Sequence, residues 1–454
     1  MSMTPYLQRR STRFDPTINW RDEYARKLCA PEEAALQFKS GDHLWMPPGH
    51  ASLPILEALA ARRDELEGVE VRAVIVPDAG WFTEDMMEAF KLAPQFGTLF
   101  DREAVNSRVA DYHPYWLVGI HKAWDAGREE GEAWPVDVLQ IRCSPPNEAG
   151  FVSLGGSVWD GVSSAKRATK VIAEVNENVI ETFGDSWLHV SEIDHFVPAD
   201  SPLVVNLEHP PPNDVDMALA HHVSELVQDG DTIQVGVGSH TGALPRLGAF
   251  DDKENLSYFA ELTVEGLVPL VERGVITGKY SDTHPDRFVA TVIGNTPEEH
   301  AVVHQNPAFE TYGIEYLLDP RQIARNERIV AINGALTADL SGQMGVHTIG
   351  PRVYAGVGGH LAFAIGAYLA PKGRYVAVIP STNRDGTIST IMPQFDPGQI
   401  VTVPRDIADT VVTEYGIARL LGKTVRQRAD ELISVAHPDY RGELRKAAQK
   451  LFYP

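Results

Sequence analysis

Short apolar runs separated by helical stretches constrain the fold of this chain more than any other feature. Runs rich in β-branched residues lie at 69–76, 136–141, 170–175, 232–235, 328–332 and 375–379. Between such runs, apolar residues recur at helical spacing, as they do from Leu53 to Leu66. Strands separated by helices pair in parallel through right-handed crossovers. The pattern therefore predicts an α/β protein.

A cluster of prolines marks the predicted domain boundary. Pro198, Pro202 and the three prolines at 210–212 cannot continue a helix or a central strand. A chain of 454 residues is also too long for one ordinary core. We therefore predict three parts with one α/β topology shared by both domains: an N-terminal domain over 1–200, a linker over 201–213, and a C-terminal domain over 214–454.

Composition narrows the class of protein. The formal net charge of -22 argues against nucleic acid as a partner, because phosphate binding needs concentrated positive charge. An anionic substrate would have to be met by local Arg or Lys side chains or by backbone amides. No apolar run reaches the roughly 20 residues of a membrane span, and residues 1–20 lack the apolar region of a secretory signal. With only two cysteines, Cys29 and Cys143, we expect a soluble cytoplasmic enzyme.

One carboxylate stands in an unfavourable place for a charge. Glu261 is surrounded in sequence by Tyr258, Phe259, Leu262 and Val264. A carboxylate in such company is paired, shifted in pKa, or used in chemistry. We interpret Glu261 as a nucleophile.

A first glycine pair follows the predicted strand at 232–235. Gly236 and Gly238 allow positive φ and a close approach of a ligand to the backbone. A tight exit from the strand explains the same pattern equally well. The dinucleotide fingerprint needs a third glycine where this chain has Thr241. A Rossmann dehydrogenase is therefore at best the second choice.

A second glycine group precedes the predicted helix at 361–369. Gly356, Gly358 and Gly359 are suited to expose successive N–H groups to an oxyanion at a helix N-terminus, although a packing turn is the alternative. Arg384 lies in a polar loop after the strand at 375–379. It is a candidate for holding a phosphate or a carboxylate, with a solvated turn arginine as the alternative.

The sequence contains none of the motifs of several other common catalytic chemistries. The 16 histidines include no HExxH, and the neighbours His221 and His222 point about 100° apart on a helix, which disfavours a shared metal site. There is no G-x-S-x-G elbow and no Walker A sequence. Cys143 is followed closely by two prolines and is interpreted as a core residue.

Taken together, these segments resemble the acetyl-CoA hydrolase/transferase family, which includes the 4-hydroxybutyrate CoA-transferases. The resemblance extends from about Trp20 to Leu444. Its markers lie at residues 144–150, 172–176, 229–238, 333–336, 339–343, 356–359, 411–416 and 436–441.

The resemblance implies two similar open α/β domains with the active site between them, acyl-CoA as co-substrate, no metal, and a homodimer or higher homo-oligomer. It places the nucleophile on Glu261 and the oxyanion-binding loop on Gly358 and Gly359. The positions that it implies for CoA contacts are Gly236, Val237, Gly238, Ser239, His240, Leu336, Ala355, Gly359 and Arg384.

The chain departs from the family pattern at three places. Phe259 and Ala260 stand where polar residues usually precede the glutamate, Arg384 stands where lysine is common, and residues 239–242 replace a more usual Ile-Pro-Asp/Asn stretch. These differences concern the acyl group and CoA more than the chemistry.

The predicted reaction is transfer of CoA from an acyl-CoA to a carboxylic acid through a thioester on Glu261. Three alternatives stay open: an acyl-CoA hydrolase using the same glutamate, a nucleotide-binding oxidoreductase, and a non-catalytic CoA sensor. The acyl group is not specified by the sequence.

Overall fold

The computed structural model describes residues 13–98, 101–114, 116–122, 124, 134–201 and 211–453. They divide into two compact units. Unit 1 holds the described residues up to 201 with Thr291–Ile293 and His300–Glu315, and unit 2 holds 211–290, Gly294–Glu299 and the described residues from Tyr316 onward. Most of the predicted linker at 201–213 lies outside the described residues, so the domain limits stay a prediction.

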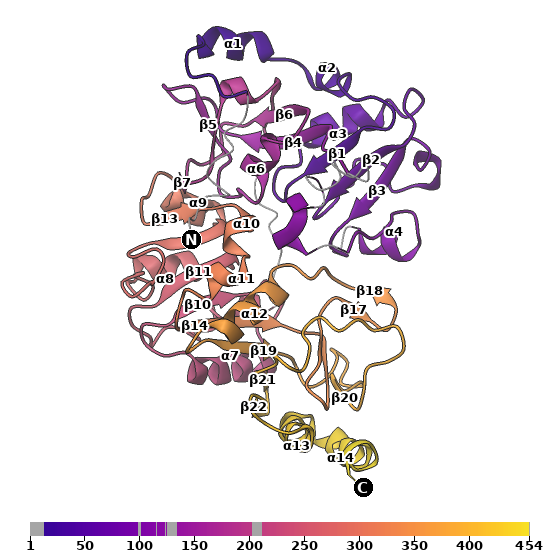
Figure 1. The fold of residues 1–454 in the computed structure, drawn as a ribbon, viewed down its shortest axis with the longest axis vertical. Helices are drawn as coiled ribbons and strands as arrows, with labels where there is room; N and C mark the ends of the chain where they lie inside the picture. The colour runs from indigo at the N-terminus through magenta and orange to yellow at the C-terminus, as the bar shows by residue number, and fades with distance from the viewer. Residues whose placement is uncertain are drawn as a thin grey trace. The chain divides into compact units, whose positions relative to one another are not determined.

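Unit 1 is built on a six-stranded sheet in the order β3-β2-β1-β4-β6-β9 (Figure 1). Each strand of this sheet pairs in parallel with its neighbours. The strands are β1 (His43–Met46), β2 (Val69–Ala73), β3 (Phe90–Pro94), β4 (Val138–Cys143), β6 (Lys170–Val175) and β9 (His195–Pro198). The helices are α1 (Trp20–Lys27), α2 (Pro31–Ala35), α3 (Leu53–Ala60), α4 (Arg102–Asn106) and α6 (Gly161–Ala165).

Short strands complete unit 1. The pair β5 (Phe151–Ser153) and β8 (Trp187–His189) is antiparallel, and β7 (Phe183–Gly184) runs parallel to β13 (Phe309–Thr311). The core consists mainly of apolar side chains from α2, α3 and strands β1 to β3, among them Leu44, Leu56 and Phe90, with Phe38 from the segment between α2 and β1.

Unit 2 carries a sheet in the order β22-β21-β19-β14-β10-β11-β12, with β22 antiparallel to β21. The strands are β10 (Thr232–Val235), β11 (Ser257–Leu262), β12 (Phe288–Val292), β14 (Ile329–Gly334), β19 (Arg374–Val378), β21 (Thr410–Thr413) and β22 (Gly416–Arg419). Every residue of β10 is buried, which means that the sheet is covered on both faces there.

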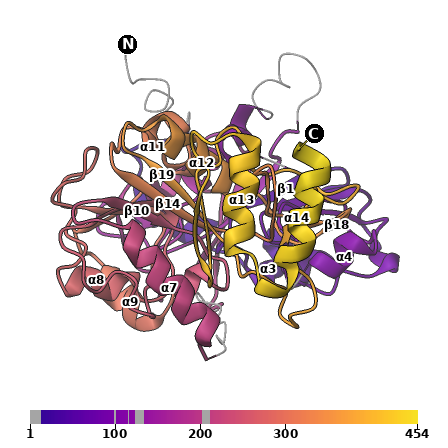
Figure 2. The same ribbon diagram turned by 90° about the horizontal axis from the view of Figure 1, so that it is seen from below.

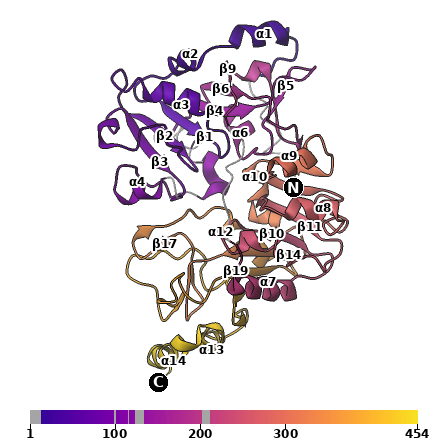
Figure 3. The ribbon, with the colours of Figure 1, turned by 180° about the vertical axis from the view of Figure 1, so that it is seen from behind.

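Helices α7 (Asp214–Leu226), α8 (Leu267–Glu272), α11 (Pro320–Ile323), α12 (His360–Leu369), α13 (Val425–Val435) and α14 (Pro438–Phe452) belong to unit 2. Figure 2 shows α13 and α14 side by side, and Figure 3 shows α12 near β14 and β19, against which it packs. Small strands β15 (Thr337–Asp339), β16 (Met344–Gly345) and β20 (Ile391–Met392) form a separate sheet, and β17 (Thr348–Ile349) pairs with β18 (Arg352–Val353).

The two sheets follow the same rule. In unit 1, strands β1 to β3 follow one another from the centre of the sheet to one edge, and the strands from β4 onward follow one another to the other edge. In unit 2, β10 to β12 and then β14 to β21 are arranged in the same way. Such a reversal creates a switch point between neighbouring parallel strands, outside whose carboxyl ends ligands bind in open α/β sheets. The predicted α/β fold, with two similar parallel-sheet units, is confirmed.

Among the described residues, no helix is both long enough and apolar enough to cross a bilayer.

Candidate active site

Glu261 lies at the carboxyl end of β11, a strand that the sequence analysis did not identify. Alternation along a strand places Phe259 and Glu261 on the same face, and Phe259 is only 1% exposed. On the other face, the Tyr258 ring stacks on Phe288 with centroids 4.3 Å apart, and its hydroxyl donates to the carbonyl of Leu262 at 2.7 Å. The backbone that carries the carboxylate is therefore fixed by buried aromatic side chains.

The carboxylate of Glu261 meets the beginning of α12. Its Oε2 accepts a hydrogen bond from the N–H of Gly359, the N-cap residue of that helix, at 2.6 Å. A Cβ on residue 359 would overlap Oε2 and would lie 2.8 Å from Cδ2 of Leu318. Gly358 has φ +56°, in the left-handed region that favours glycine. Glycine at both positions is what allows the amide to reach the carboxylate.

The electrostatic setting of Glu261 is unusual. Burial raises the pKa of its carboxyl group to about 7, and the Gly359 hydrogen bond only partly opposes this rise. The other oxygen, Oε1, has no hydrogen-bond partner within the described part of the chain. Among the described residues, the carboxylate has one hydrogen-bond donor, the N–H of Gly359 at the N-terminus of α12.

The loop after β11 is held by two residues that sequence reasoning missed. The Thr263 hydroxyl accepts hydrogen bonds from the N–H of Gly294 and the side chain of Asn295, both at 3.0 Å. The buried Glu299 carboxylate accepts from the N–H of Gly266 at 2.9 Å and from the N–H of Asn295 at 2.8 Å. Nothing in the sequence marks Glu299, because its partners are backbone N–H groups 4 and 33 residues away and the side chain of Asn295.

A buried histidine supports the start of α12. His360 Nε2 lies 2.6 Å from the hydroxyl of Tyr375 on β19. Burial lowers the pKa of His360 to about 3, so the ring is neutral at physiological pH. The residue next to Gly359 is thereby tied to the central sheet.

The glycine loop after β10 packs against neighbouring strands. A Cβ on Gly236 would lie 2.6 Å from Oδ1 of Asn333, and one on Gly238 would lie 3.6 Å from Cα of Gly334. Val237, Gly238 and Ser239 are exposed, and His240 is half-buried. The two glycines thus permit a close approach between the ends of β10 and β14, and neither of them adopts a positive φ.

The other predicted CoA contacts follow later strands. Leu336 comes after β14, where its N–H donates to the carbonyl of Gly345 at 2.9 Å. Ala355 is half-buried, and its N–H donates to the carbonyl of His347 at 3.2 Å. Arg384 is exposed in the loop after β19 and makes no ion pair with any described residue. Of the predicted site residues, Glu261 and Gly359 are in direct contact; CoA binding by the others stays a prediction.

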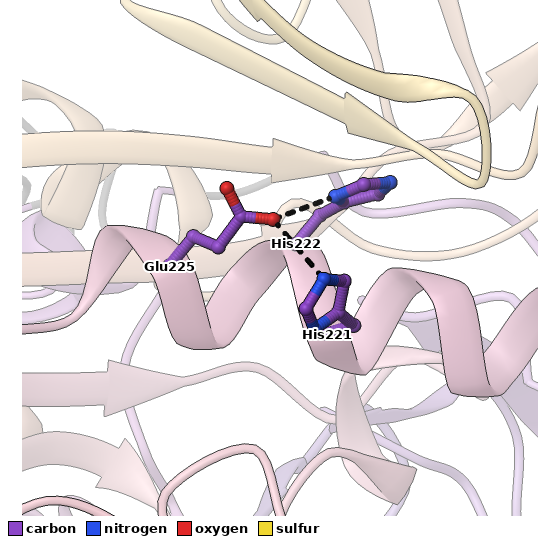
Figure 4. Close-up of side chains that lie close together, drawn as sticks. All are labelled: His221, His222 and Glu225. Carbon is purple, nitrogen blue, oxygen red and sulfur yellow. Dashed lines mark hydrogen bonds and ion pairs between the residues drawn. The ribbon is translucent and has the colours of Figure 1, made fainter.

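Three potential metal ligands gather on α7, as Figure 4 shows. Oε1 of Glu225 lies 3.5 Å from Nε2 of His221 and 3.1 Å from Nδ1 of His222. The sequence predicts that the two rings diverge, but Glu225, three and four residues further on, contacts both of them. All three side chains are at least partly exposed, and their contacts lie on the surface of the helix.

A cavity of about 450 Å³ lies at the opposite, amino ends of β10 and β14, beside Thr232 and Arg328. Four acidic side chains line it: Asp229, Glu254, Asp282 and Glu327. A wall of this charge repels an anionic ligand such as an acyl-CoA. This acidic cavity is therefore not a candidate for the acyl-CoA binding site.

Comparisons with known proteins give the family. Residues 8–208 match the acetyl-CoA hydrolase/transferase N-terminal domain, and residues 296–448 match the C-terminal domain of the same family. A succinyl-CoA:cyclohexane-1-carboxylate CoA transferase from Geobacter metallireducens is 37% identical over 95% of this chain and 97% of that protein. A 4-hydroxybutyrate coenzyme A transferase from Clostridium kluyveri is 36% identical over 96% and 100%.

Solved structures agree with this result. RipA from Yersinia pestis superposes with a TM-score of 0.88 at 30% identity, covering 96% of this chain and all of that chain. The chain belongs to the acetyl-CoA hydrolase/transferase family. The family and the enzyme class expected from the motifs, a CoA-transferase, are confirmed.

Proposed function

We propose that this protein transfers coenzyme A from an acyl-CoA to a carboxylic acid through a thioester on Glu261. The observation that carries the proposal is the Glu261–Gly359 contact: a carboxylate with one oxygen held by a helix N-terminal amide and the other unpaired among the described residues. The CoA-transfer activity of the two sequence relatives supports the reaction class.

The first half-reaction begins at the unpaired oxygen. Oε1 of Glu261 attacks the thioester carbonyl, the C–S bond breaks, and CoA leaves as the thiolate, which gives an acyl-glutamyl anhydride. The thiolate then attacks Cδ of Glu261. The acyl group leaves as a carboxylate with the bridging oxygen, and Glu261 becomes a CoA thioester. A second carboxylic acid reverses these steps, so the thioester energy is kept.

Gly359 has a defined part in this sequence. When the thiolate attacks Cδ, negative charge develops on the glutamyl oxygen that remains, the atom to which the Gly359 N–H already donates. A fixed donor at a developing oxyanion is typically worth about 10²–10³ in rate. Gly358, whose positive φ shapes the preceding turn, is assigned a supporting part in the same loop.

Replacement of the nucleophile tests the proposal. Glu261→Ala is expected to lower the transfer rate by about 10³-fold or more, and Glu261→Asp, which withdraws the carboxylate, by about 10²-fold. Intact-protein mass spectrometry after incubation with acetyl-CoA or succinyl-CoA is expected to detect the CoA adduct on wild type and to detect none on Glu261→Ala. Glu225→Ala, the same change on an exposed helix glutamate, is the matched control. Wild-type rates in Glu261→Ala would refute the proposal.

Hydrolysis is the second candidate, because the family includes hydrolases and the same thioester would react with water. Release of CoA is measured with and without an acceptor acid. Transfer predicts release that depends on the acid, whereas hydrolysis predicts release without it.

From the composition and the family resemblance we also propose a cytoplasmic homodimer or higher homo-oligomer that needs no metal. Light scattering tests the oligomeric state, and an unchanged rate in EDTA is expected.

A further inference from the structure

The exposed side of α7 carries three side chains whose donor atoms converge. Nε2 of His221 lies 3.5 Å, and Nδ1 of His222 lies 3.1 Å, from the same atom, Oε1 of Glu225. All three donor atoms lie within 4.8 Å of one another, and Figure 4 shows both rings beside the carboxylate. Two imidazole nitrogens and one carboxylate oxygen thus meet at one place on the helix.

The helix itself brings these side chains together. Helical side chains lean toward the preceding turn, so Glu225 reaches back to the turn that holds His221 and His222. The two rings belong to adjacent residues, yet their centroids are only 5.5 Å apart. Leu219 and Val223, on the other side of α7, are buried. The backbone that carries the three side chains is therefore fixed by packing.

The distances are those of a metal site. Ligand atoms about 2.0–2.1 Å from a tetrahedral Zn²⁺ ion lie about 3.3–3.4 Å from one another. The two contacts of Glu225, at 3.5 and 3.1 Å, already have this separation. The His221 side chain is 74% exposed, so its ring can turn toward His222 without disturbing the packing of the helix.

The charge of the helix favours a cation. Within Asp214–Leu226 there are three acidic residues and no lysine or arginine, and the whole chain has a net charge of -22. The donor set selects the kind of cation. Imidazole nitrogen suits Zn²⁺, Ni²⁺ and Cu²⁺, whereas Mg²⁺ and Ca²⁺ prefer oxygen ligands alone.

We propose that α7 binds a divalent transition-metal ion of the Zn²⁺ type through Nε2 of His221, Nδ1 of His222 and Oε1 of Glu225. Water completes the coordination, because the three side chains are 74%, 23% and 50% exposed. The ion links two successive turns of α7 and has no part in CoA transfer. The inference is therefore independent of the proposed function.

Titration calorimetry with ZnCl₂ on metal-stripped protein tests the three ligands. His221→Ala, His222→Ala and Glu225→Gln are each expected to weaken Zn²⁺ binding about tenfold or more. The side chains are at least partly exposed and alanine favours a helix, so the variants should fold, and circular dichroism checks this. MgCl₂ at the same concentrations is expected to give no heat that depends on these residues.

The matched control is His437→Ala. Nδ1 of His437 lies 3.7 Å from a single carboxylate, that of Asp439, without a second imidazole in the group. This variant is expected to keep wild-type Zn²⁺ affinity. Any weakening of Zn²⁺ binding in the α7 variants is then specific to their site, rather than the loss of one histidine among the 16 in the chain.

Two further measurements report the geometry and the effect of the ion. Co²⁺ is expected to give the strong visible absorption of a tetrahedral site with wild type and not with the His221→Ala/His222→Ala double variant. Zn²⁺ should likewise raise the Tm of wild type and leave that of the double variant unchanged.

Wild-type Zn²⁺ affinity in any of the three single variants would overturn the three-ligand site, as would an equal Tm shift in wild type and the double variant. Neither result would affect the proposal for Glu261. Conversely, a wild type that binds Zn²⁺ at α7 but forms no CoA adduct would overturn only the proposed function.

Discussion

Two glutamates, one in each unit, lie near the ends of parallel strands and have opposite surroundings. Glu174 on β6 is fully buried with a cation: Nε of Arg142 is 3.2 Å from its Oε1, and Asn176 and Ser201 donate to its oxygens at 3.0 and 2.7 Å. Glu261 on β11 has a single backbone donor among the described residues. Glu174 lies within residues 8–208, which match the N-terminal domain of the family, whereas Glu261 lies between the two matched segments.

The difference separates a structural carboxylate from a reactive one. A buried charge with a full set of partners is stable in its ionised form and has no oxygen left for chemistry. Burial without a cation raises the pKa of Glu261 to about 7 and leaves one oxygen unpaired within the described chain. Glu261, the proposed reactive group, thus has fewer hydrogen-bond and charge partners than Glu174, as expected of a residue in a functional site.

The largest effect on stability is expected at Glu174. Removing one member of a buried ion pair leaves an uncompensated charge, so Glu174→Ala should lower the free energy of unfolding by about 3–5 kcal/mol. Urea denaturation measures this, and the Glu174→Ala/Arg142→Met double variant should recover part of the loss. An unfolding free energy equal to that of wild type, with CoA transfer abolished, would reverse the roles given to the two glutamates.

Gly359→Ala should lower kcat about 10²-fold, because the added methyl group displaces the Glu261 carboxylate from its donor. The matched control is Gly442→Ala on α14, where a Cβ meets no atom within 4 Å. That change should leave kcat unaltered and stabilise the helix by about 0.5–1 kcal/mol. Equal rates in the two variants would show that the Gly359 contact is irrelevant to catalysis.

The pH profile should report the Glu261 carboxyl group. Attack requires the ionised form, so log(kcat/KM) should rise with a slope near one below about pH 7 and level off above it. In each pH unit below the midpoint the rate falls about tenfold. A profile that stays flat down to pH 5 would contradict the raised pKa.

The smallest expected effect is a gain in stability for Glu261→Gln. The folded-state pKa of about 7 lies above the ordinary 4.5, so wild type loses stability as the pH rises between these values. The variant lacks this loss and should be more stable by roughly 1–3 kcal/mol at pH 8, with no difference below pH 4.5. Thermal unfolding of wild type and variant at pH 4 and pH 8 provides the comparison. A stability gain that is larger at pH 4 than at pH 8 would contradict the prediction.

Much of the fold could be predicted from the sequence. The strand at Lys170–Val175 agrees residue for residue, and those beginning near Thr232 and Arg374 agree within one residue or so. Long β-branched runs are buried wherever they pair, so their identity is local information. The strand that carries Glu261 was missed because a charged residue interrupts its apolar pattern.

For the site, the sequence by itself determined which residue types are present: a glutamate with apolar sequence neighbours, and glycine segments that follow strands. Only the tertiary structure decided that Gly359, 98 residues away, donates to Glu261 and that Glu299 holds the following loop. Backbone amides and helix caps look alike at every position of a sequence. Their direction is set when strands pair in register and helices pack, so the chemistry of Glu261 depends on contacts that no local pattern encodes.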